Sequence, residues 1–194
     1  MAIHGEHLSK RVYEEYAMVL DYIPQGRPSP ERHRHIAVPT IQVLGENYFT
    51  LLEAELKYGA SVSIQEKLYI GRERREKVDR IIGRISYGDL TVNAKAELPV
   101  TIEHLIKTQE KRFVDFFNDS QALTQRMHSL ELLPGVGKKS MWLIVKERER
   151  KPFADFKDVE GRTKLPVLKT LTERIMDELV QGAESKYRIF TRTF

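Results

Sequence analysis

The sequence predicts an α+β fold in which a barrel-like β half precedes a helical half. Over residues 10–97, apolar and aromatic residues gather in short runs separated by turn residues, a pattern typical of strands. From Leu98 onward, apolar residues recur at three- and four-residue spacing, as on the buried face of a helix. With 194 residues, the chain is long enough for two modules that each bury a core.

Five strands are expected in the first half. A turn at Gly45-Glu46-Asn47 joins the second to the third, and a charged loop at residues 71–77 precedes the last. Five short strands with one long connection favour a small closed or half-closed barrel, most like an OB-fold. An SH3-like barrel or an open sheet would give a similar pattern. The expected strands cover residues 12–23, 36–44, 48–56, 67–70 and 81–92.

A helix is expected over residues 99–117, because proline suits the first helical position. Phe113, Phe116 and Phe117 recur along it at the spacing of a buried face, so they should belong to the core. Polar residues at 118–120 offer helix-capping side chains and mark a break. We therefore expect an OB-like domain at residues 1–118 and a helical domain at residues 119–194.

The segment from Leu133 to Ser140, Leu-Pro-Gly-Val-Gly-Lys-Lys-Ser, is the most specific motif in the chain. Two glycines in four residues suit a tight turn that requires positive φ, and the turn opens directly into a helix. Unpaired N–H groups and the helix dipole then converge on one point, which attracts phosphate. The pattern is that of a helix-hairpin-helix nucleic-acid-binding motif. An ordinary glycine-rich connection between two helices is the alternative. The residues expected to bind nucleic acid here are Gly135, Val136, Gly137, Lys138, Lys139 and Ser140.

Helices are expected on both sides of this hairpin, the first around Leu123 to Leu130 and the second over residues 141–151. A degenerate second hairpin is expected at residues 159–162, so Gly161 and Arg162 join the candidate site. A plain connecting turn is the alternative there. A short helix over 153–158 would precede this turn, and a helix from Leu165-Pro166 to Gly182 would follow it. The tail at 186–192 alternates basic and apolar residues and suits a further strand.

The basic excess lies entirely in the second half. Residues 119–194 carry 15 Lys/Arg and 11 Asp/Glu, so 15 − 11 = +4, whereas residues 1–118 carry 17 of each. This asymmetry is in the direction of a nucleic-acid footprint.

Arg72, Arg74 and Arg75 in the charged loop form a second candidate nucleic-acid-binding surface, although the interleaved Glu73 and Glu76 also fit a solvated loop. His33 and His35 alternate between arginines without further ligands, so no metal site is expected.

The absence of cysteine excludes disulfides and cysteine-based zinc or thiol chemistry, and it fits a reducing cytosol. The N-terminus has no apolar signal region, and no apolar stretch reaches membrane-spanning length. We expect a cytoplasmic protein that uses no membrane and no cofactor.

The barrel-like half, the Leu133–Ser140 hairpin, residues 157–162 and the Arg188–Arg192 tail together resemble an archaeal protein family. Its members have no established activity and are described as RNA-binding, with an OB-like domain before a helix-hairpin-helix domain. The resemblance covers nearly the full chain and implies that RNA is bound rather than DNA. One departure is Met141, where many such motifs carry alanine; the bulkier side chain should splay the two helices.

The expected function is therefore non-enzymatic binding of nucleic acid through its phosphates. The chain shows no serine–histidine–aspartate arrangement, no P-loop and no paired metal carboxylates, so no catalytic residue is expected. A DNA-repair glycosylase or nuclease is one alternative, because Asp155 lies about where helix-hairpin-helix glycosylases carry an aspartate. A protein-binding scaffold is the other.

Overall fold

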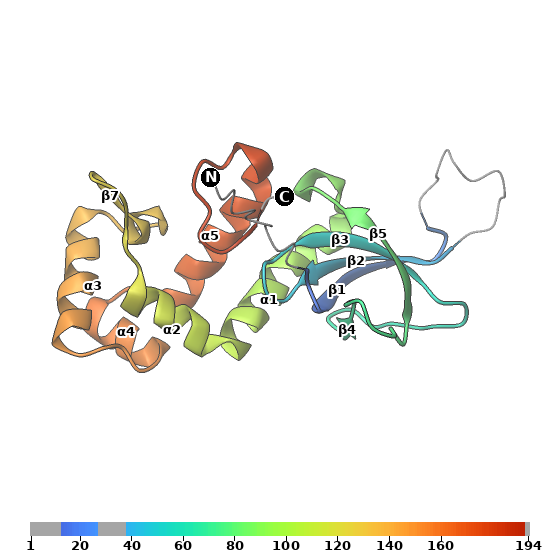
Figure 1. Ribbon diagram of the computed structural model, residues 1–194, viewed down its shortest axis with the longest axis horizontal. Helices are drawn as coiled ribbons and strands as arrows, with labels where there is room; N and C mark the ends of the chain where they lie inside the picture. Colours follow the sequence, from blue (N-terminus) through green and yellow to red (C-terminus); the bar gives the residue numbers. More distant parts are fainter. Residues whose placement is uncertain (1–12, 27–37, 193–194) are drawn as a thin grey trace, which may run out of the picture.

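The computed structural model describes residues 13–26 and 38–192 and has an α+β fold (Figure 1). A curled antiparallel sheet comes first, with the strand order β4-β1-β2-β3-β5, and helices follow it. The edge strands β4 and β5 do not pair with each other, so the curled sheet stays open as a half-barrel. The expected α+β class and five-stranded, half-closed sheet are confirmed. The strands are β1 (Tyr16–Ile23), β2 (Thr40–Gly45), β3 (Leu51–Leu56), β4 (Lys67–Tyr69) and β5 (Val78–Arg84). His33 and His35 lie outside the described residues.

Both faces of the sheet are largely buried along β1, β2 and β3, which explains why these strands are rich in apolar residues, whereas β5 is mostly exposed. Side chains alternate between the faces of a strand. Along β1, Ala17 and Val19 belong to a cluster inside the half-barrel. Met18 and Leu20 belong to a second cluster shared with the helices. The sheet is therefore fixed on its outer face to the helical part of the molecule.

The last expected strand, over residues 81–92, is wrong beyond Arg84, where β5 ends. Residues 87–89 form a 3-10 turn, η1 (Tyr87–Asp89), and helix α1 (Val92–Thr108) begins soon after. The Thr91 hydroxyl accepts the Ala94 N–H at 3.0 Å and so caps the helix start. Pro99 consequently lies inside α1 and not at its first position.

The helix expected over residues 99–117 is two helices. It breaks at Gln109, whose φ of −112° and ψ of 31° leave the helical region, and α2 (Glu110–Asp119) follows. The Gln109 side-chain amide donates to the Glu46 carbonyl at 3.0 Å, which ties the break to the sheet. Phe113 and Phe117 are fully buried and Phe116 packs partly buried against them, so the expected core role of these rings is confirmed.

The helix expected around Leu123 to Leu130 is wrong. A short two-stranded hairpin and one 3-10 turn occupy this segment, because Ser129 donates both its N–H (3.0 Å) and its hydroxyl (2.7 Å) to the Gln121 carbonyl. These bonds close the chain on itself and compete with a helix. The remaining elements are β6 (Ala122–Thr124), β7 (Met127–His128), η2 (Ser129–Leu132), α3 (Lys138–Arg150), α4 (Phe156–Thr163), α5 (Val167–Gln181) and η3 (Gly182–Glu184).

The turn expected at residues 159–162 is wrong. Residues 159–162 lie inside α4, and the chain turns at Lys164-Leu165-Pro166 instead. Lys164 takes the left-handed conformation that ends the helix, with φ of +61°. Gly161 occupies a helical position in α4, which glycine tolerates at a modest cost. The expected helix from Leu165-Pro166 to Gly182 is confirmed as α5.

One hydrophobic cluster runs from Met18 in the sheet to Phe190 in the tail. Phe190 packs on Phe113 and Phe116, with ring centroids 5.4 and 5.0 Å apart. The tail has no strand within its described residues and is held by side-chain contacts described below. The domain division at residue 119 stays a prediction, and this core crosses it.

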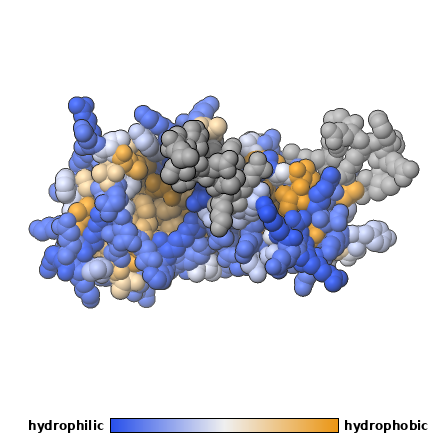
Figure 2. All heavy atoms as spheres, in the orientation of Figure 1, coloured by the Kyte–Doolittle hydropathy of each residue, from blue (hydrophilic) through white to orange (hydrophobic). Residues whose placement is uncertain are grey.

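Figure 2 shows one face with hydrophilic residues over most of the surface and apolar residues gathered in a hollow of the helical part and over the sheet. Among the described residues, no helix combines the length and hydrophobicity needed to cross a lipid bilayer.

Candidate nucleic-acid interface

The Leu133–Ser140 segment forms a tight turn whose apolar residues anchor it and whose glycines face outward. Leu133 and Val136 are buried, and the Val136 N–H donates to the Leu133 carbonyl at 3.0 Å. Gly135 has a φ of +77°, a conformation that favours glycine. Gly137 has a φ of −89°, which any residue adopts, and a Cβ there would meet nothing within 4 Å. The two glycines therefore have different roles.

Helix α3 begins without any side chain capping it. Gly137 is the N-cap residue, and the first backbone bond of the helix runs from the Met141 N–H to the Gly137 carbonyl at 2.9 Å. The N–H groups of Lys138, Lys139 and Ser140 thus have no acceptor within the helix. These donors and the positive end of the helix dipole are directed at the same place and can hold an anion.

The turn before α5 resembles the turn before α3. Gly135 and Lys164, which are 164 − 135 = 29 positions apart, both have positive φ, and the residue after each, Val136 and Leu165, is buried. The next residues, Gly137 and Pro166, are the N-caps of α3 and α5. The two turns therefore share a positive-φ residue followed by a buried residue, but their N-cap residues differ, with ψ of −177° at Gly137 and 84° at Pro166.

The two helix starts differ in their electrostatics. At α5, the Glu160 carboxylate accepts the Val167 N–H at 3.0 Å, and Pro166 has no N–H to offer. An internal carboxylate thus occupies the position where an anion would bind. The α3 start has no such occupant, so it is the stronger anion-binding candidate of the two.

A pocket of about 280 Å³ separates the two turns. Ser140 approaches it from α3, and Lys164 and Lys169 approach it from the second turn and α5. Lys169 lies 3.8 Å from Glu173, a distance that leaves its charge loosely paired. The lining residues are Pro134, Gly135, Ser140, Ile144, Thr163, Lys164, Leu165, Pro166, Lys169, Thr170 and Glu173.

Lys138 and Lys139 are adjacent but differ in their partners. The Lys138 ammonium bonds to the Glu131 carboxylate (2.8 Å) and to the Arg126 carbonyl (2.6 Å). The His128 N–H and then Lys138 hold the pKa of Glu131 below its usual value of 4.5. Lys139 is exposed and has no ion-pair partner among the described residues. Lys139 is therefore the cation more available to a ligand.

Sequence reasoning missed Trp142. It is the single tryptophan of the chain, and its side chain is 64% exposed on α3. It follows Lys139 by three positions, so the two side chains share a helix face beside the turn. The available signal was its position outside the apolar stripe of Met141 and Ile144, since an aromatic residue off the buried face is unusual for a core role.

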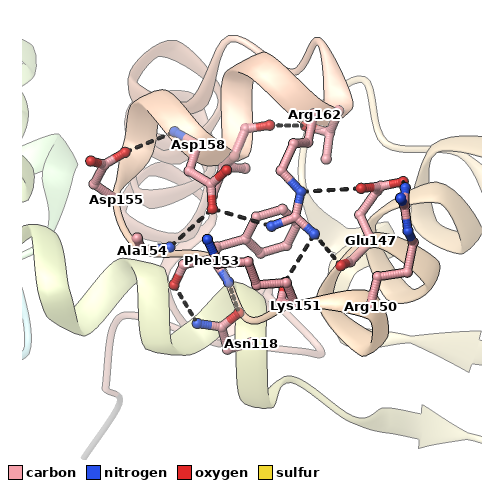
Figure 3. Close-up of polar contacts among 11 residues, drawn as sticks. Asn118, Glu147, Arg150, Lys151, Phe153, Ala154, Asp155, Asp158 and Arg162 are labelled. Atoms are coloured by element: carbon pink, nitrogen blue, oxygen red, sulfur yellow. Dashed lines mark hydrogen bonds and ion pairs between the residues drawn. The ribbon is translucent and has the colours of Figure 1, made fainter.

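Arg162, a predicted contact, is committed to the fold (Figure 3). Its guanidinium bonds to the Glu147 carboxylate (3.1 Å), the Asp158 carboxylate (3.1 Å) and the Lys151 carbonyl (2.9 Å), and also to the Glu147 carbonyl. It lies over the Phe153 ring at 4.4 Å. These contacts lower the pKa of Glu147, with Arg162 as the largest cause. The N–H groups of Arg162 hold α3 against α4, so they are already used by the fold and are not available to a ligand.

The second predicted surface lies far from the hairpin. Arg72, Arg74 and Arg75 lie between β4 and β5, whereas the turn lies beside α3 at the other end of the molecule (Figure 1). Arg75 donates to the Ile70 and Gly71 carbonyls at 3.1 and 2.8 Å and so holds its own loop. Arg72 lies over the Tyr13 ring at 4.3 Å, and Arg74 is exposed. The fold does not bring the two predicted surfaces together.

Asp155, the residue behind the glycosylase alternative, is the N-cap of α4. Its carboxylate accepts the Asp158 N–H at 2.7 Å. Within the described part of the chain, no group of three or more histidine, aspartate or glutamate side chains could hold a metal ion.

Comparison with known proteins supports the coarser part of the resemblance noted from the sequence, an uncharacterised family with archaeal members. A family model described as "Protein of unknown function (DUF655)" matches residues 13–192. The chain belongs to this family. A relative described as "Uncharacterized protein MJ0038", from Methanocaldococcus jannaschii, is 41% identical over 180 residues, which cover 93% of this chain and 81% of the relative. The crystal structure of Af1531 from Archaeoglobus fulgidus, titled as a DUF655 protein, is 46% identical with a TM-score of 0.83. That match covers 92% of this chain and all (100%) of Af1531.

Proposed function

We propose that this DUF655 protein binds nucleic acid without catalysing a reaction, and that it holds backbone phosphates at the start of α3. The observation that carries the proposal is the uncapped helix start at Gly137, where three consecutive N–H groups lack an acceptor within the helix. Contacts of this kind position a strand and do not read its sequence.

Three neighbouring features support phosphate over other anions. Lys139 adds an available positive charge, and Ser140 adds a hydroxyl at the edge of the pocket between the turns. Trp142 adds an exposed ring on the same helix face, and aromatic rings stack on nucleobases. Amides, cation and ring together suit a chain in which phosphates and bases alternate.

The half-barrel fits the same proposal. OB-folds are five-stranded, partly open barrels that bind oligonucleotides with the face of strands 2 and 3 and the loops after strands 1 and 4. Arg72, Arg74 and Arg75 lie in the loop after β4, which is one of these positions. We propose that the two halves are an OB-like domain and a variant helix-hairpin-helix domain, in which the 3-10 turn η2 stands where the first helix of the hairpin was expected. The family resemblance favours RNA over DNA.

The glycosylase, nuclease and scaffold alternatives stay open but gain no supporting observation. The Asp155 carboxylate has an evident use as a helix cap, which accounts for its position without chemistry.

A single substitution separates the anion site from the fold. In Gly137→Asp, the new carboxylate would cap α3 from within, because aspartate is a preferred N-cap residue. We expect the free energy of unfolding to hold or rise slightly. We expect RNA affinity to fall about tenfold or more, since a hydrogen bond to a charged group contributes about 1.5 kcal/mol or more. Trp142 fluorescence during titration with a short single-stranded RNA measures this, and labelled-RNA anisotropy checks it.

The matched control is Val100→Asp, which adds the same charge at an exposed position on α1. It should bind RNA nearly as the original chain does. Equal affinity of Gly137→Asp and Val100→Asp for RNA would refute phosphate binding at α3. Repeating the titration with DNA of the same sequence tests the preference for RNA.

A further inference from the structure

A second pocket, of about 240 Å³, lies where the sheet meets the C-terminal tail. The end of β5 and the η1 turn form one wall, and the end of α5 and the tail form the other. None of its residues was singled out as a binding residue from the sequence. Its lining residues are Phe49, Thr50, Leu51, Arg84, Ile85, Ser86, Tyr87, Glu178, Leu179, Gly182, Ala183, Arg188, Thr191 and Arg192.

The charged groups that line this pocket are three arginines and one glutamate among the described residues. Arg84 comes from the sheet, and Arg188 and Arg192 come from the tail, more than a hundred positions later in the chain. The Arg192 guanidinium is fixed over the Tyr48 ring at 4.3 Å. The fold thus brings three arginines from distant segments to the wall of one pocket.

The single lining carboxylate is already saturated. Glu178 is fully buried and accepts the Arg174 Nε–H (2.9 Å), the N–H groups of residues 189–191 (2.9, 3.2 and 2.8 Å) and the Thr191 hydroxyl (2.9 Å). Its charge is balanced by Arg174, with which it forms a buried ion pair. Glu178 therefore does not offset the charge of Arg188 or Arg192, and the carboxylate that acts on Arg84 is that of Glu14.

Two donors that belong to the pocket residues lack any acceptor. Arg188 Nη2 and Thr50 Oγ1 are both buried and have no hydrogen-bond partner, and Thr50 is only 7% exposed. A buried donor without a partner costs free energy that an incoming acceptor recovers. An oxyanion seated between the sheet and the tail would accept from both.

The loop that presents Thr50 is held rigidly. The Glu14 carboxylate accepts the N–H groups of Asn47, Tyr48 and Thr50 at 2.9, 2.9 and 3.2 Å. Phe49, between the last two, is fully buried with a φ of +52°, which is uncommon for an aromatic residue. The backbone that carries Thr50 is therefore fixed in place before any ligand arrives.

We propose that this pocket binds a phosphoryl group through Arg84, Arg188 and Arg192, with the Thr50 hydroxyl donating to one phosphate oxygen. Guanidinium groups match phosphate by donating paired, parallel hydrogen bonds, and clusters of arginine are the usual device for recognising it. The phosphoryl group can belong to a free phosphorylated compound or to a nucleic-acid strand. The inference does not depend on the α3 site.

The test compares variants of the full chain with pyrophosphate as the probe, by calorimetry and by thermal shift against potassium chloride of equal ionic strength. Arg188→Gln should weaken pyrophosphate binding about tenfold to a hundredfold, as expected for loss of a charge-assisted hydrogen bond. Thr50→Val should weaken it about tenfold while the melting temperature without ligand holds or rises, because the buried hydroxyl lacks a partner. Lys157→Gln removes one charge from an exposed site on α4. It should change neither the affinity for pyrophosphate nor the melting temperature without ligand.

Two further titrations identify the source of the phosphoryl group. A mononucleotide that binds with the same dependence on Arg188 and Thr50 indicates a free ligand. A short RNA that shows this dependence, when pyrophosphate and the mononucleotide do not bind, indicates a strand. Gly137→Asp should leave Arg188-dependent binding in place, which separates this pocket from the α3 site. The proposal is overturned if no phosphoryl compound distinguishes Arg188→Gln and Thr50→Val from Lys157→Gln.

Discussion

Lys138 and Lys139 show how strongly single residues of one motif can differ. Both follow the Gly-Val-Gly turn, and the sequence gives no reason to separate them. The difference arises from Glu131, which pairs with Lys138 from the preceding 3-10 turn. Arg162 is a similar case, because its partner Glu147 lies on another helix. Such pairings depend on how elements pack, so the motif predicted the turn but not which of its cations are available.

The two lysines should therefore affect RNA binding unequally. Lys139→Ala should reduce the slope of log affinity against log salt by about one, since each neutralised phosphate contributes about 0.7 to 0.9. Lys138→Ala should reduce it less, because Glu131 already offsets that charge. Lys157→Ala, at an exposed position on α4, is the matched control and should leave the slope unchanged. Equal slopes for Lys138→Ala and Lys139→Ala would contradict this assignment.

His128 should make the hairpin sensitive to pH. Its Nδ1 accepts the Leu130 N–H at 3.1 Å, which requires the neutral ring, and burial followed by Arg148 lowers its pKa from 6.5. The unfolded chain therefore takes up the proton first. The contribution of the neutral His128 ring to the free energy of unfolding is complete above pH 6.5. It is lost as the pH falls through the lower pKa that His128 has in the folded state.

Two measurements check this pH dependence. An NMR titration should give His128 a pKa below 6.5. The free energy of unfolding should fall less between pH 7.5 and pH 5.5 in His128→Asn than in the original chain. Asparagine can cap the turn and does not titrate in this range. A His128 pKa at or above 6.5 would show that the lone pair on Nδ1 is not held by the fold.

At the scale of elements, apolar patterning predicted the five strands and α5 because both depend on local burial. Turn positions were predicted less well. The first hairpin has its glycine at the positive-φ position, whereas Lys164 takes that position in the second and Gly161 lies inside a helix. At the break, the Gln109 side chain bonds to the Glu46 carbonyl in the turn between β2 and β3, 109 − 46 = 63 positions earlier, so local patterning could not reveal this contact.

The tail should depend on Glu178 for its attachment to α5. Glu178→Ala removes five hydrogen bonds from Arg174 and the tail and leaves Arg174 buried without its partner. We expect a loss of about 3–5 kcal/mol in the free energy of unfolding, typical of a broken buried pair. Glu173→Ala, an exposed position on the same helix, should cost under about 0.5 kcal/mol. Denaturant titration measures both, and similar losses would contradict the anchoring role.

The whole molecule shares one core between its two halves, since the cluster from Met18 to Phe190 includes residues of the sheet, α1, α2 and α5. A core of this kind favours unfolding as one unit. We expect a single transition for the full chain, seen alike by calorimetry and circular dichroism. Fragments 1–118 and 119–194 should each lack a cooperative transition, because each loses the partner of its apolar surface. Two independently cooperative fragments would instead support the domain boundary that the sequence suggested at residue 119.

The central claim is that the uncapped start of α3 holds phosphate. The most direct measurement is an NMR titration of the full chain with a short single-stranded RNA, following backbone amides. We predict saturable shifts at Gly137, Lys138, Lys139 and Ser140, whose N–H groups are directed at the site, and loss of these shifts in Gly137→Asp. Shifts confined to the Arg72–Arg75 loop or to the pocket at Arg188, with the α3 amides unmoved at saturating RNA, would contradict the claim.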